Sequence, residues 1–512
     1  MALQSTVKMP ESPAAGSETQ LASVAASAVV APAVIAPPVE APPVEAPPVE
    51  APPVAAPEPS AREIRDWLKQ QLARPLAATA TLVVTVPAPR VDPETLLEVS
   101  SRRLGVVWDP PDGLAFAGVG ATHRIELEGP EPLERLRSRA SGVWSQLTTR
   151  NHPACMAVTP RLYGGVAFDP HGAREEPWQE FGSGCFTLPR IGYSTDGQRA
   201  SLSLAVRGNE LTTPEQRLAW VTEVDALRSL MQSPLGADLT RDRLSAVRAI
   251  HRTSQDLWHA EVEAIVAGIR DGAFQKIVAA RSSRVELMAP LETAAVLRRL
   301  SRGLRSSTRF AFCRRRSTFI GATPERLITR RGRSIATEAL AGSIASGAEG
   351  AGRLLRSDKD LGEHQLVVDE LVRRLGPLCQ HLEVDPHPRV RELRDVMHLL
   401  TPISGTLAEP RHVLELVEEL HPTPAVGGVP TETAMRWISR HETFSRGWYA
   451  APVGWFDAQG DGDFAVALRS CVLRGSEAFL FAGAGIVGDS DPRSEYIETE
   501  LKEQALLTAL GA

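Results

Sequence analysis

The clearest structural pattern in this chain is a pair of strand-like runs joined by a turn. Residues 453–457 and 464–468 are rich in apolar residues, and Gly460-Asp461-Gly462-Asp463 lies between them. Such a turn between two strand-like runs predicts an antiparallel β-hairpin. Elsewhere strand-like and helix-like segments mix without the strict alternation of a parallel sheet. We therefore expect an α+β fold with large antiparallel sheets.

Other segments show the periodicity of regular elements. Residues 317–320 and 327–329 are two short strand-like runs, which we interpret as a second hairpin. Apolar residues that recur every 3.6 positions predict amphipathic helices. Alternating apolar and polar residues, or a high content of β-branched residues, predict strands. The remaining predicted elements are strands over 82–86, 201–206 and 478–481 and helices over 62–72, 211–231, 254–270, 358–375 and 494–510.

The first 60 residues contain a proline repeat and differ in composition from the rest of the chain. The pattern A-P-P-V-E recurs at a period of five over residues 36–54. Paired prolines fix φ and remove backbone donors, so this segment predicts an extended polyproline II stalk. We expect residues 1–60 to be a disordered tail, because its composition cannot build a core. The tail is interpreted as a solubilising segment, with partner binding as the alternative, and residues 61–512 as the folded domain.

Charge and cysteine usage exclude several classes of protein. Six acidic residues and one lysine in residues 1–60 account for −5 of the net charge of −6, so the remainder is nearly neutral. A nearly neutral domain offers no basic face to a nucleic acid or to an anionic membrane. The longest apolar stretch, 21–36, is shorter than the roughly 20 residues of a membrane span. Five scattered cysteines form no zinc-binding pair, and a cytoplasmic location is expected.

A glycine-rich motif near the C-terminus admits two interpretations. The residues from Gly483 to Gly488, G-A-G-I-V-G, match the G-x-G-x-x-G fingerprint of dinucleotide-binding proteins. That fingerprint needs a second strand and an acidic residue about 20 residues further on, and the chain stops at Ala512. We therefore expect the glycines to let backbone N–H groups approach an anionic ligand. A dinucleotide-binding oxidoreductase remains the distant alternative.

Two predicted helices carry acidic side chains. One places Asp360 and Glu363 on the same face, three residues apart, and the other carries Glu495, Glu498 and Lys502. Carboxylate oxygens are the ligands that Mg²⁺ prefers, so two such helices could together bind it. A pair such as Glu498 and Lys502 is equally typical of a solvent-exposed helix face. Spacing alone leaves both interpretations open.

Eight sequence blocks between residues 274 and 502 occur in an order that resembles one known family. They include F-Q-K-I-V-A-A-R from Phe274, T-E-A-L-A-G-S from Thr337 and H-P-T-P-A-V-G-G-V-P from His421. The others are F-I-G-A-T-P-E-R-L from Phe319, S-D-K-D-L-G-E-H from Ser357, H-L-L-T-P-I-S-G from His398, residues 447–469 and residues 482–502. Together they resemble the chorismate-utilising enzymes, which include the isochorismate, salicylate, anthranilate and aminodeoxychorismate synthases.

The resemblance implies one fold for residues 61–512, with motifs densest in 254–512. That fold is a single large α+β unit with two facing, mainly antiparallel sheets, flanked by helices, and a central substrate cleft. It also implies a magnesium ion, because Glu363 and Glu498 match the family's Mg²⁺ ligands. Asp360 and Glu495 match the surrounding acidic residues.

The resemblance also implies substrate-binding positions. Arg469 and Lys502 match the cations that hold a chorismate carboxylate, which suits a planar guanidinium and a point ammonium. His398 lies near the substrate in the family, and the alternative is a hydrogen-bonded core histidine. The remaining implied substrate-binding residues are Gly342, Ala425, Gly483 and Gly485.

Four positions bear on the kind of chorismate chemistry. Lys276 stands where water-using members have lysine, which implies a general base; a surface lysine ending a strand is the alternative. Glu325 resembles the general acid that protonates the departing hydroxyl. Ala425 stands where salicylate and anthranilate synthases have threonine, and Thr431 where ammonia-using members usually have lysine.

These positions imply the isochorismate branch of the family, with salicylate synthase chemistry as the alternative. The expected reaction is a magnesium-dependent, reversible conversion of chorismate by addition of water at C2 and loss of the C4 hydroxyl. Since water is the nucleophile and no glutaminase-like segment is present, no amidotransferase subunit is expected. A monomer is expected, and the use of the product in siderophore, menaquinone or salicylate synthesis stays open.

Overall fold

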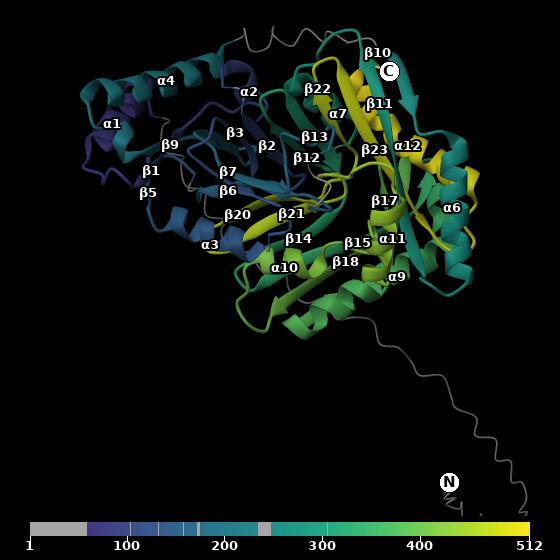
Figure 1. Ribbon diagram of the computed structural model, residues 1–512. Coiled ribbons are helices and arrows are strands. Elements are labelled where there is room, and N and C mark those ends of the chain that lie inside the picture. Colours follow the sequence, from purple (N-terminus) through teal and green to yellow (C-terminus); the bar gives the residue numbers. More distant parts are fainter. Residues whose placement is uncertain are drawn as a thin grey trace, which may run out of the picture. The chain divides into compact units, whose positions relative to one another are not determined.

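Two β-sheets contain all of the strands that the computed structural model describes (Figure 1). The described residues are 59–512 without 103, 132, 157, 171–174, 234–246 and 305. The predicted disordered tail therefore lies almost entirely outside the described residues. All described residues belong to one compact unit, Ala56–Ala512.

The larger sheet has 13 strands in the described part of the chain. Its strands are β1 (Thr81–Pro87), β2 (Gly105–Asp109), β3 (Ala115–Val119), β5 (Leu147–Asn151), β8 (Ile191–Thr195), β9 (Ala200–Arg207), β10 (Val247–Arg252), β11 (Lys276–Leu287), β12 (Thr308–Cys313), β13 (Ser317–Thr323), β19 (Gly428–Val429), β22 (Ser470–Arg474) and β23 (Glu477–Ile486). They follow the order β10-β11-β23-β22-β13-β12-β2-β3-β8-β9-β1-β5, with β19 beside β11. The pair β1–β5 is parallel, whereas β11 and β23 form a long antiparallel pair.

The smaller sheet has 10 strands among the described residues. They are β4 (His123–Leu127), β6 (Arg161–Val166), β7 (Gly184–Leu188), β14 (Arg326–Arg331), β15 (Ser334–Ala345), β16 (Cys379–Val384), β17 (Arg389–Glu392), β18 (Val396–Leu407), β20 (Pro452–Asp457) and β21 (Gly462–Val466). The order is β16-β18-β15-β14-β21-β20-β6-β7-β4, and β17 pairs with β18. The hairpin predicted near residue 460 is confirmed, because Gly454 of β20 lies opposite Phe464 of β21.

The second predicted hairpin is wrong. Strand β13 pairs with β12 and β22 in the larger sheet, whereas β14 pairs with β15 and β21 in the smaller one. The chain crosses between the sheets at Pro324 and Glu325, where proline has no N–H to donate to a strand ladder. The Thr323 hydroxyl holds this crossing by donating to Val466 O (2.5 Å) and accepting from Glu325 N–H (3.2 Å).

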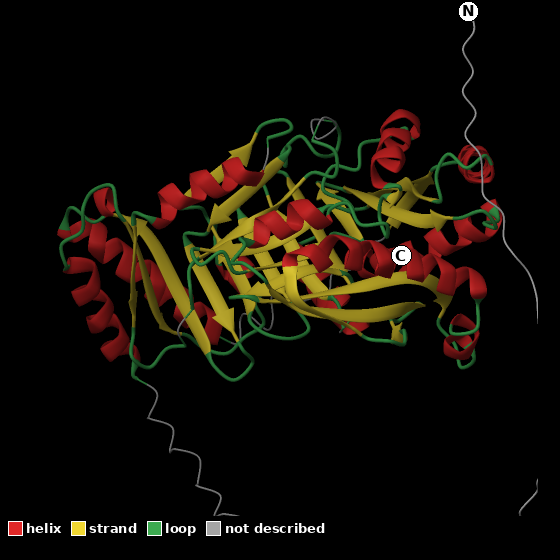
Figure 2. Cartoon of the chain, turned by 90° about the horizontal axis from the view of Figure 1, so that it is seen from below, coloured by secondary structure: helices red, strands yellow, loops and turns green. Residues whose placement is uncertain are grey.

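Helices cover the outer faces of the sheets (Figure 2). Helix α4 begins at Pro214, later than predicted, because Thr213 caps it and proline suits its first position. The predicted helix over 358–375 is confirmed, and Ser357 caps it. Within the described residues the α-helices are α1 (Ala61–Ala73), α2 (Thr95–Val99), α3 (Leu133–Trp144), α4 (Pro214–Gln232), α6 (Gln255–Arg270), α7 (Thr293–Gly303), α8 (Gly350–Leu354), α9 (Asp358–Leu375), α10 (Val413–Leu420), α11 (Thr431–His441) and α12 (Pro492–Leu510).

The sheets face one another across an aromatic core. Phe116 of β3 stacks on Tyr163 of β6 with ring centroids 4.1 Å apart, which joins the larger sheet to the smaller. A second core lies where α1, α4, α7 and the end of α12 pack on the larger sheet. The expected α+β fold with two facing, mainly antiparallel sheets is thus confirmed. No helix in the described ranges is long and apolar enough to cross a membrane.

Candidate active site

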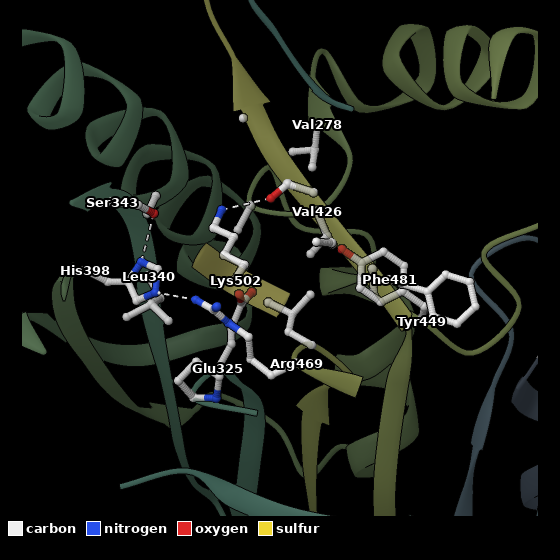
Figure 3. A pocket seen from close by; sticks show the side chains of 18 of the residues that line it. Val278, Glu325, Leu340, Ser343, His398, Val426, Tyr449, Arg469, Phe481 and Lys502 are labelled. Atoms are coloured by element: carbon white, nitrogen blue, oxygen red, sulfur yellow. Dashed lines mark hydrogen bonds between the residues drawn. The ribbon is translucent and has the colours of Figure 1, made fainter. Parts of the chain in front are cut away.

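A cavity of about 690 Å³ lies between strands of the two sheets (Figure 3). Its walls come from β11 and β23 of the larger sheet and from β15 and β18 of the smaller one. Nine residues predicted from the sequence line it: Glu325, Gly342, Glu363, His398, Ala425, Arg469, Gly483, Gly485 and Lys502. The other four, Lys276, Asp360, Glu495 and Glu498, are not among its lining residues, and the contacts below show how they relate to it.

Lys276 is a buried partner of a cavity carboxylate. It is the first residue of β11, its side chain is fully buried, and its Nζ lies 2.9 Å from Glu363 Oε1 of α9. The surface-lysine alternative is therefore wrong. Burial opposes ionisation of Glu363, but Lys276, followed by Lys502 and Lys359, holds the pKa of Glu363 below its usual value. Glu363 is thus an ionised carboxylate at the edge of the cavity.

Glu325 occupies the opposite electrostatic environment. It lies at the crossing between β13 and β14 and is 5% exposed. Burial raises the pKa of Glu325 to about 8, and the nearby Glu338 acts in the same direction, outweighing Lys276 and Lys502. A carboxyl group with this pKa carries a proton at neutral pH and can donate it.

His398 holds Arg469 in place. Arg469 Nη2 donates to His398 Nε2 (3.1 Å), and His398 Nδ1 lies 3.0 Å from Ser343 Oγ and 3.2 Å from Gly342 O (Figure 3). Because a guanidinium can only donate, Nε2 is the acceptor and the proton is on Nδ1. Burial, followed by the charge of Arg469, lowers the pKa of His398 well below its usual value. His398 is therefore neutral, and it is both a cavity residue and a hydrogen-bonded one.

The glycine motif belongs to a strand instead of a loop. Gly483 and Gly485 lie in β23, opposite Ala280 and Val278 of β11, and the next helix begins only at Pro492. This arrangement lacks the strand–turn–helix geometry of a dinucleotide fingerprint. A Cβ at position 485 would overlap the carboxylate of Glu363 and lie 2.8 Å from Lys276 Cε. Glycine there makes room for the ion pair of the site.

Lys502 ties helix α12 to strand β23. Its Nζ donates to Gly483 O at 2.9 Å and lies 2.6 Å from Glu498 Oε1, one turn earlier on the helix. One backbone oxygen and one carboxylate leave the third ammonium hydrogen available to an anion in the cavity. Lys502 and Arg469 therefore supply two cationic side chains to the same cavity.

Helices α9 and α12 bring four carboxylates to this end of β11 and β23. Lys359 Nζ lies 2.7 Å from Glu495 Oε1. Burial raises the pKa of Glu495, and the charge of Glu498 raises it further. Burial also raises the pKa of Asp360. Hard oxygen donors that repel one another suit a divalent cation. Within the described ranges, however, no three ligand-type side chains stand close enough together to form a ready metal cluster.

Three polar residues that line the cavity were missed in the sequence prediction. Ser343 supports His398, and Tyr449 lines the wall beside Phe481, on whose ring it stacks. Arg446 donates to Val426 O (2.7 Å) and Val278 O (2.8 Å), which joins the loop of Ala425 to β11. Ser343 and Tyr449 fall within the matched sequence blocks, and Arg446 directly precedes one, but a block by itself does not show which side chains face a cavity.

Comparison with known proteins agrees with the site. The family described as "Chorismate binding enzyme" matches residues 68–511. A salicylate biosynthesis isochorismate synthase of Pseudomonas aeruginosa is 37% identical over 79% of this chain and 84% of its own. The isochorismate synthase MenF of Bacillus subtilis is 34% identical over 79% of this chain and 87% of its own.

A solved structure shows the same architecture. The menaquinone-specific isochorismate synthase MenF of Escherichia coli superposes with a TM-score of 0.72 at 27% identity, covering 88% of this chain and 99% of that one. The match in sequence spans nearly all of the described residues, including every residue that lines the cavity. The chain therefore belongs to the family of chorismate-binding enzymes.

Proposed function

We propose that the protein is an isochorismate synthase, an isomerase that converts chorismate into isochorismate. The observation that carries the proposal is a cavity lined by a protonated Glu325 and by the cationic side chains of Arg469 and Lys502, with the Lys276–Glu363 pair beside them. Relatives with this activity in their names align over about four fifths of the chain.

The reaction needs a proton acceptor, a proton donor and binding groups for a dicarboxylate. Arg469 and Lys502 pair with the carboxylates of chorismate and orient its ring. Lys276 takes the proton of the water that adds at C2, and Glu325 gives its proton to the hydroxyl that leaves C4. One water enters and one leaves, so chorismate and isochorismate are isomers.

Magnesium completes the proposed site. Glu363 and Glu498 would hold the ion, with Asp360 and Glu495 beside them, and the ion would supply positive charge for a substrate carboxylate. A lysine can accept a proton only when it is neutral, and an ionised partner stabilises its ammonium form. Engagement of the Glu363 carboxylate by magnesium would therefore favour the base role of Lys276.

Several finer features belong to the same proposal. Water is the nucleophile, so the enzyme needs no ammonia-supplying amidotransferase subunit. The protein acts as a monomer in the cytoplasm, a setting that suits its five free thiols, of which Cys185, Cys313 and Cys471 are buried.

Product analysis tests the proposal. Purified protein given chorismate and MgCl₂ is expected to form a mixture of chorismate and isochorismate, separated by chromatography, with no pyruvate in proportion to turnover. Stoichiometric pyruvate and salicylate would instead show the salicylate synthase reaction. Lys276→Ala is expected to lower kcat by about 10²–10⁴-fold with little change in KM, the usual contribution of a general base. Lys69→Ala, on the exposed face of α1, is the matched control.

A further inference from the structure

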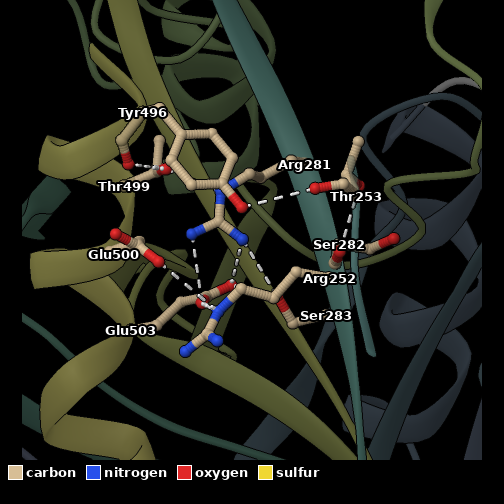
Figure 4. A network of polar contacts seen from close by, with 9 residues as sticks. All are labelled: Arg252, Thr253, Arg281, Ser282, Ser283, Tyr496, Thr499, Glu500 and Glu503. Atoms are coloured by element: carbon tan, nitrogen blue, oxygen red, sulfur yellow. Dashed lines mark hydrogen bonds and ion pairs between the residues drawn. The ribbon is translucent and has the colours of Figure 1, made fainter. Parts of the chain in front are cut away.

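A buried polar network joins strand β11 to helix α12 (Figure 4). Arg281, in the middle of β11, and Glu503, on α12, are fully buried and form two parallel hydrogen bonds of 3.2 Å, Nη1 to Oε1 and Nη2 to Oε2. Arg281 Nε also donates to Thr499 Oγ1 at 2.6 Å. The guanidinium lies 4.8 Å from the centre of the Tyr496 ring.

Neighbouring groups complete the network. Ser283 Oγ donates to Glu503 Oε1 (2.7 Å) and accepts from Arg281 Nη1 (3.0 Å). Arg252, whose side chain is 32% exposed, lies 3.6 Å from Glu503 Oε2. The attraction within a buried ion pair is largely offset by the cost of removing both charges from water. Such a pair therefore often adds little net stability. What a two-point guanidinium–carboxylate contact provides is a defined geometry.

That geometry fixes the rotation of α12 about its axis. Thr499 directly follows Glu498, and Glu503 directly follows Lys502. Successive residues of an α-helix are about 100° apart around the axis, so the side that contacts Arg281 sets the direction of the adjacent side chains. Glu495 lies one turn before Thr499, where it pairs with Lys359 of α9.

Strand β11 connects the network to the cavity. Arg281 lies opposite Ala482 of β23, which lines the cavity, and Lys276 begins the same strand five residues earlier. A contact from Arg281 to α12 therefore sets the position of the helix relative to the strand that carries the proposed base. Among the residues that the structure describes, the only other polar contact between α12 and these strands at the cavity is Lys502 Nζ to Gly483 O.

We propose that Arg281, Thr499 and Glu503 form a positioning clamp for the active site, the α12 clamp. It holds α12 at the rotation that presents Glu498 to magnesium and Lys502 to the substrate carboxylate, an inference that rests on the proposed function. None of the three residues lines the cavity. Loosening the clamp lets α12 adopt other orientations, and ligands must then restore the competent one at the expense of their affinity.

The test compares two clamp variants with wild type. Arg281→Met removes the ion pair. Thr499→Val removes the hydrogen bond from Arg281 and the one that Thr499 Oγ1 donates to Tyr496 O, while keeping the shape of a fully buried side chain. Titration calorimetry with MgCl₂ alone is expected to show a Kd raised at least about fivefold in Arg281→Met, with a smaller increase in Thr499→Val. The KM for chorismate is expected to rise similarly, while kcat at saturating magnesium and chorismate stays within about threefold of wild type.

Arg309→Met is the matched control. Arg309 of β12 is only 12% exposed and pairs with Glu94 (3.2 Å) and Asp109, but none of these residues lines the cavity. This variant is expected to lower Tm without changing the magnesium Kd or the KM. Equal losses of Tm in Arg281→Met and Arg309→Met with wild-type Kd and KM in both would overturn the clamp.

The remaining outcomes also decide the question. Should Arg281→Met fail to fold, Thr499→Val decides, and wild-type magnesium affinity and KM in that variant count against the clamp. Wild-type protein that forms no isochorismate contradicts the proposed function by itself. The calorimetric comparison of the variants is independent of turnover, so a wild-type Kd in both clamp variants contradicts only the clamp.

Discussion

Two glutamates of the cavity, Glu363 and Glu325, have opposite protonation states. Glu363 is ionised because Lys276 approaches its carboxylate to 2.9 Å. Glu325, in contrast, keeps its proton because it is buried and because Glu338 is nearby. A site that adds water and expels hydroxide needs a carboxylate that can stabilise positive charge and a carboxyl group that can donate a proton. Glu363 is in the first state and Glu325 is in the second.

The pH dependence of turnover is expected to follow Glu325. Its pKa is raised to about 8, so the proton-donating form is lost as pH rises through that value. We expect kcat to fall on the alkaline side with a midpoint near 8 in a pH profile of wild-type protein. Glu325→Gln is expected to lower kcat by about 10²–10⁴-fold, because an amide cannot protonate hydroxide. An alkaline fall that survives unchanged in Glu325→Gln would assign it to another group.

The raised pKa of Glu325 also lowers the stability of the folded protein when the pH is above the ordinary pKa of glutamate. The folded protein holds a proton up to about pH 8, whereas the unfolded chain releases it near the ordinary glutamate value, so this contribution to stability is lost as pH rises between the two. Glu325→Gln removes the penalty. Its Tm is expected to exceed that of wild type at pH 8 by more than at pH 5 in thermal unfolding. An equal difference at both pH values would contradict the assignment.

Gly485 has no side chain, which leaves space for the Lys276–Glu363 ion pair. Gly485→Ala would place a methyl group against Glu363 and Lys276 Cε, so it is expected to abolish most activity by displacing that ion pair. Gly488→Ala is the matched control, since its Cβ would meet only Ile269 Cγ2 at an ordinary 3.6 Å. Steady-state assays at saturating magnesium compare the two. Equal activity would show that the ion pair tolerates displacement.

At the scale of elements, helices α9 and α12 converge on one end of the pair β11–β23. Each helix supplies two carboxylates, and lysines of the same elements partly neutralise them. We expect activity to be lost on chelation and restored by MgCl₂. Glu363→Gln and Glu498→Gln are each expected to raise the half-saturating magnesium concentration by about tenfold or more, since a neutral amide is a poorer ligand.

Glu500→Gln provides the control for that measurement. Glu500 lies on the same helix, two residues after Glu498, and is 41% exposed beside Arg252. It is expected to keep the wild-type magnesium requirement. Wild-type magnesium dependence in Glu363→Gln and Glu498→Gln would remove these two residues as ligands.

Elements defined by nearby residues were predictable from the sequence. Helix α9 begins and ends as its periodicity indicates, because Ser357 caps it and its apolar face is regular. The hairpin of β20 and β21 follows from its turn. The interpretation of β13 and β14 as a pair was wrong, because nothing local shows that Pro324 carries the chain to the other sheet.

The site residues were predictable through resemblance, but their contacts were not. Lys276 and Glu363 are far apart in the sequence, and their ion pair depends on how α9, which packs on β15 of the smaller sheet, meets the start of β11 in the larger one. Likewise, the tautomer of His398 follows from Ser343 and Arg469, which reach it from two different segments. Spacing along a chain contains no information on such contacts, because they form only when both sheets are assembled.

At the scale of the molecule, the residues that line the cavity lie between 278 and 502. Removal of residues 1–58 leaves the whole of α1 and both cores in place, so kcat/KM for chorismate is expected to stay within about tenfold of wild type. The assay compares full-length and shortened protein at equal concentration. A larger loss would assign a catalytic contribution to the tail.

The position of β23 between β11 and β22 has a consequence for how the protein is made. Ile277 and Ile486 face each other across a ladder, although about 200 residues separate them in the chain. A ribosome that adds about 5–20 residues per second needs on the order of 10–40 s to synthesise that interval. Throughout that interval the edge of β11 has no partner from β23, and the nascent chain depends on chaperones or on its own compactness to avoid aggregation.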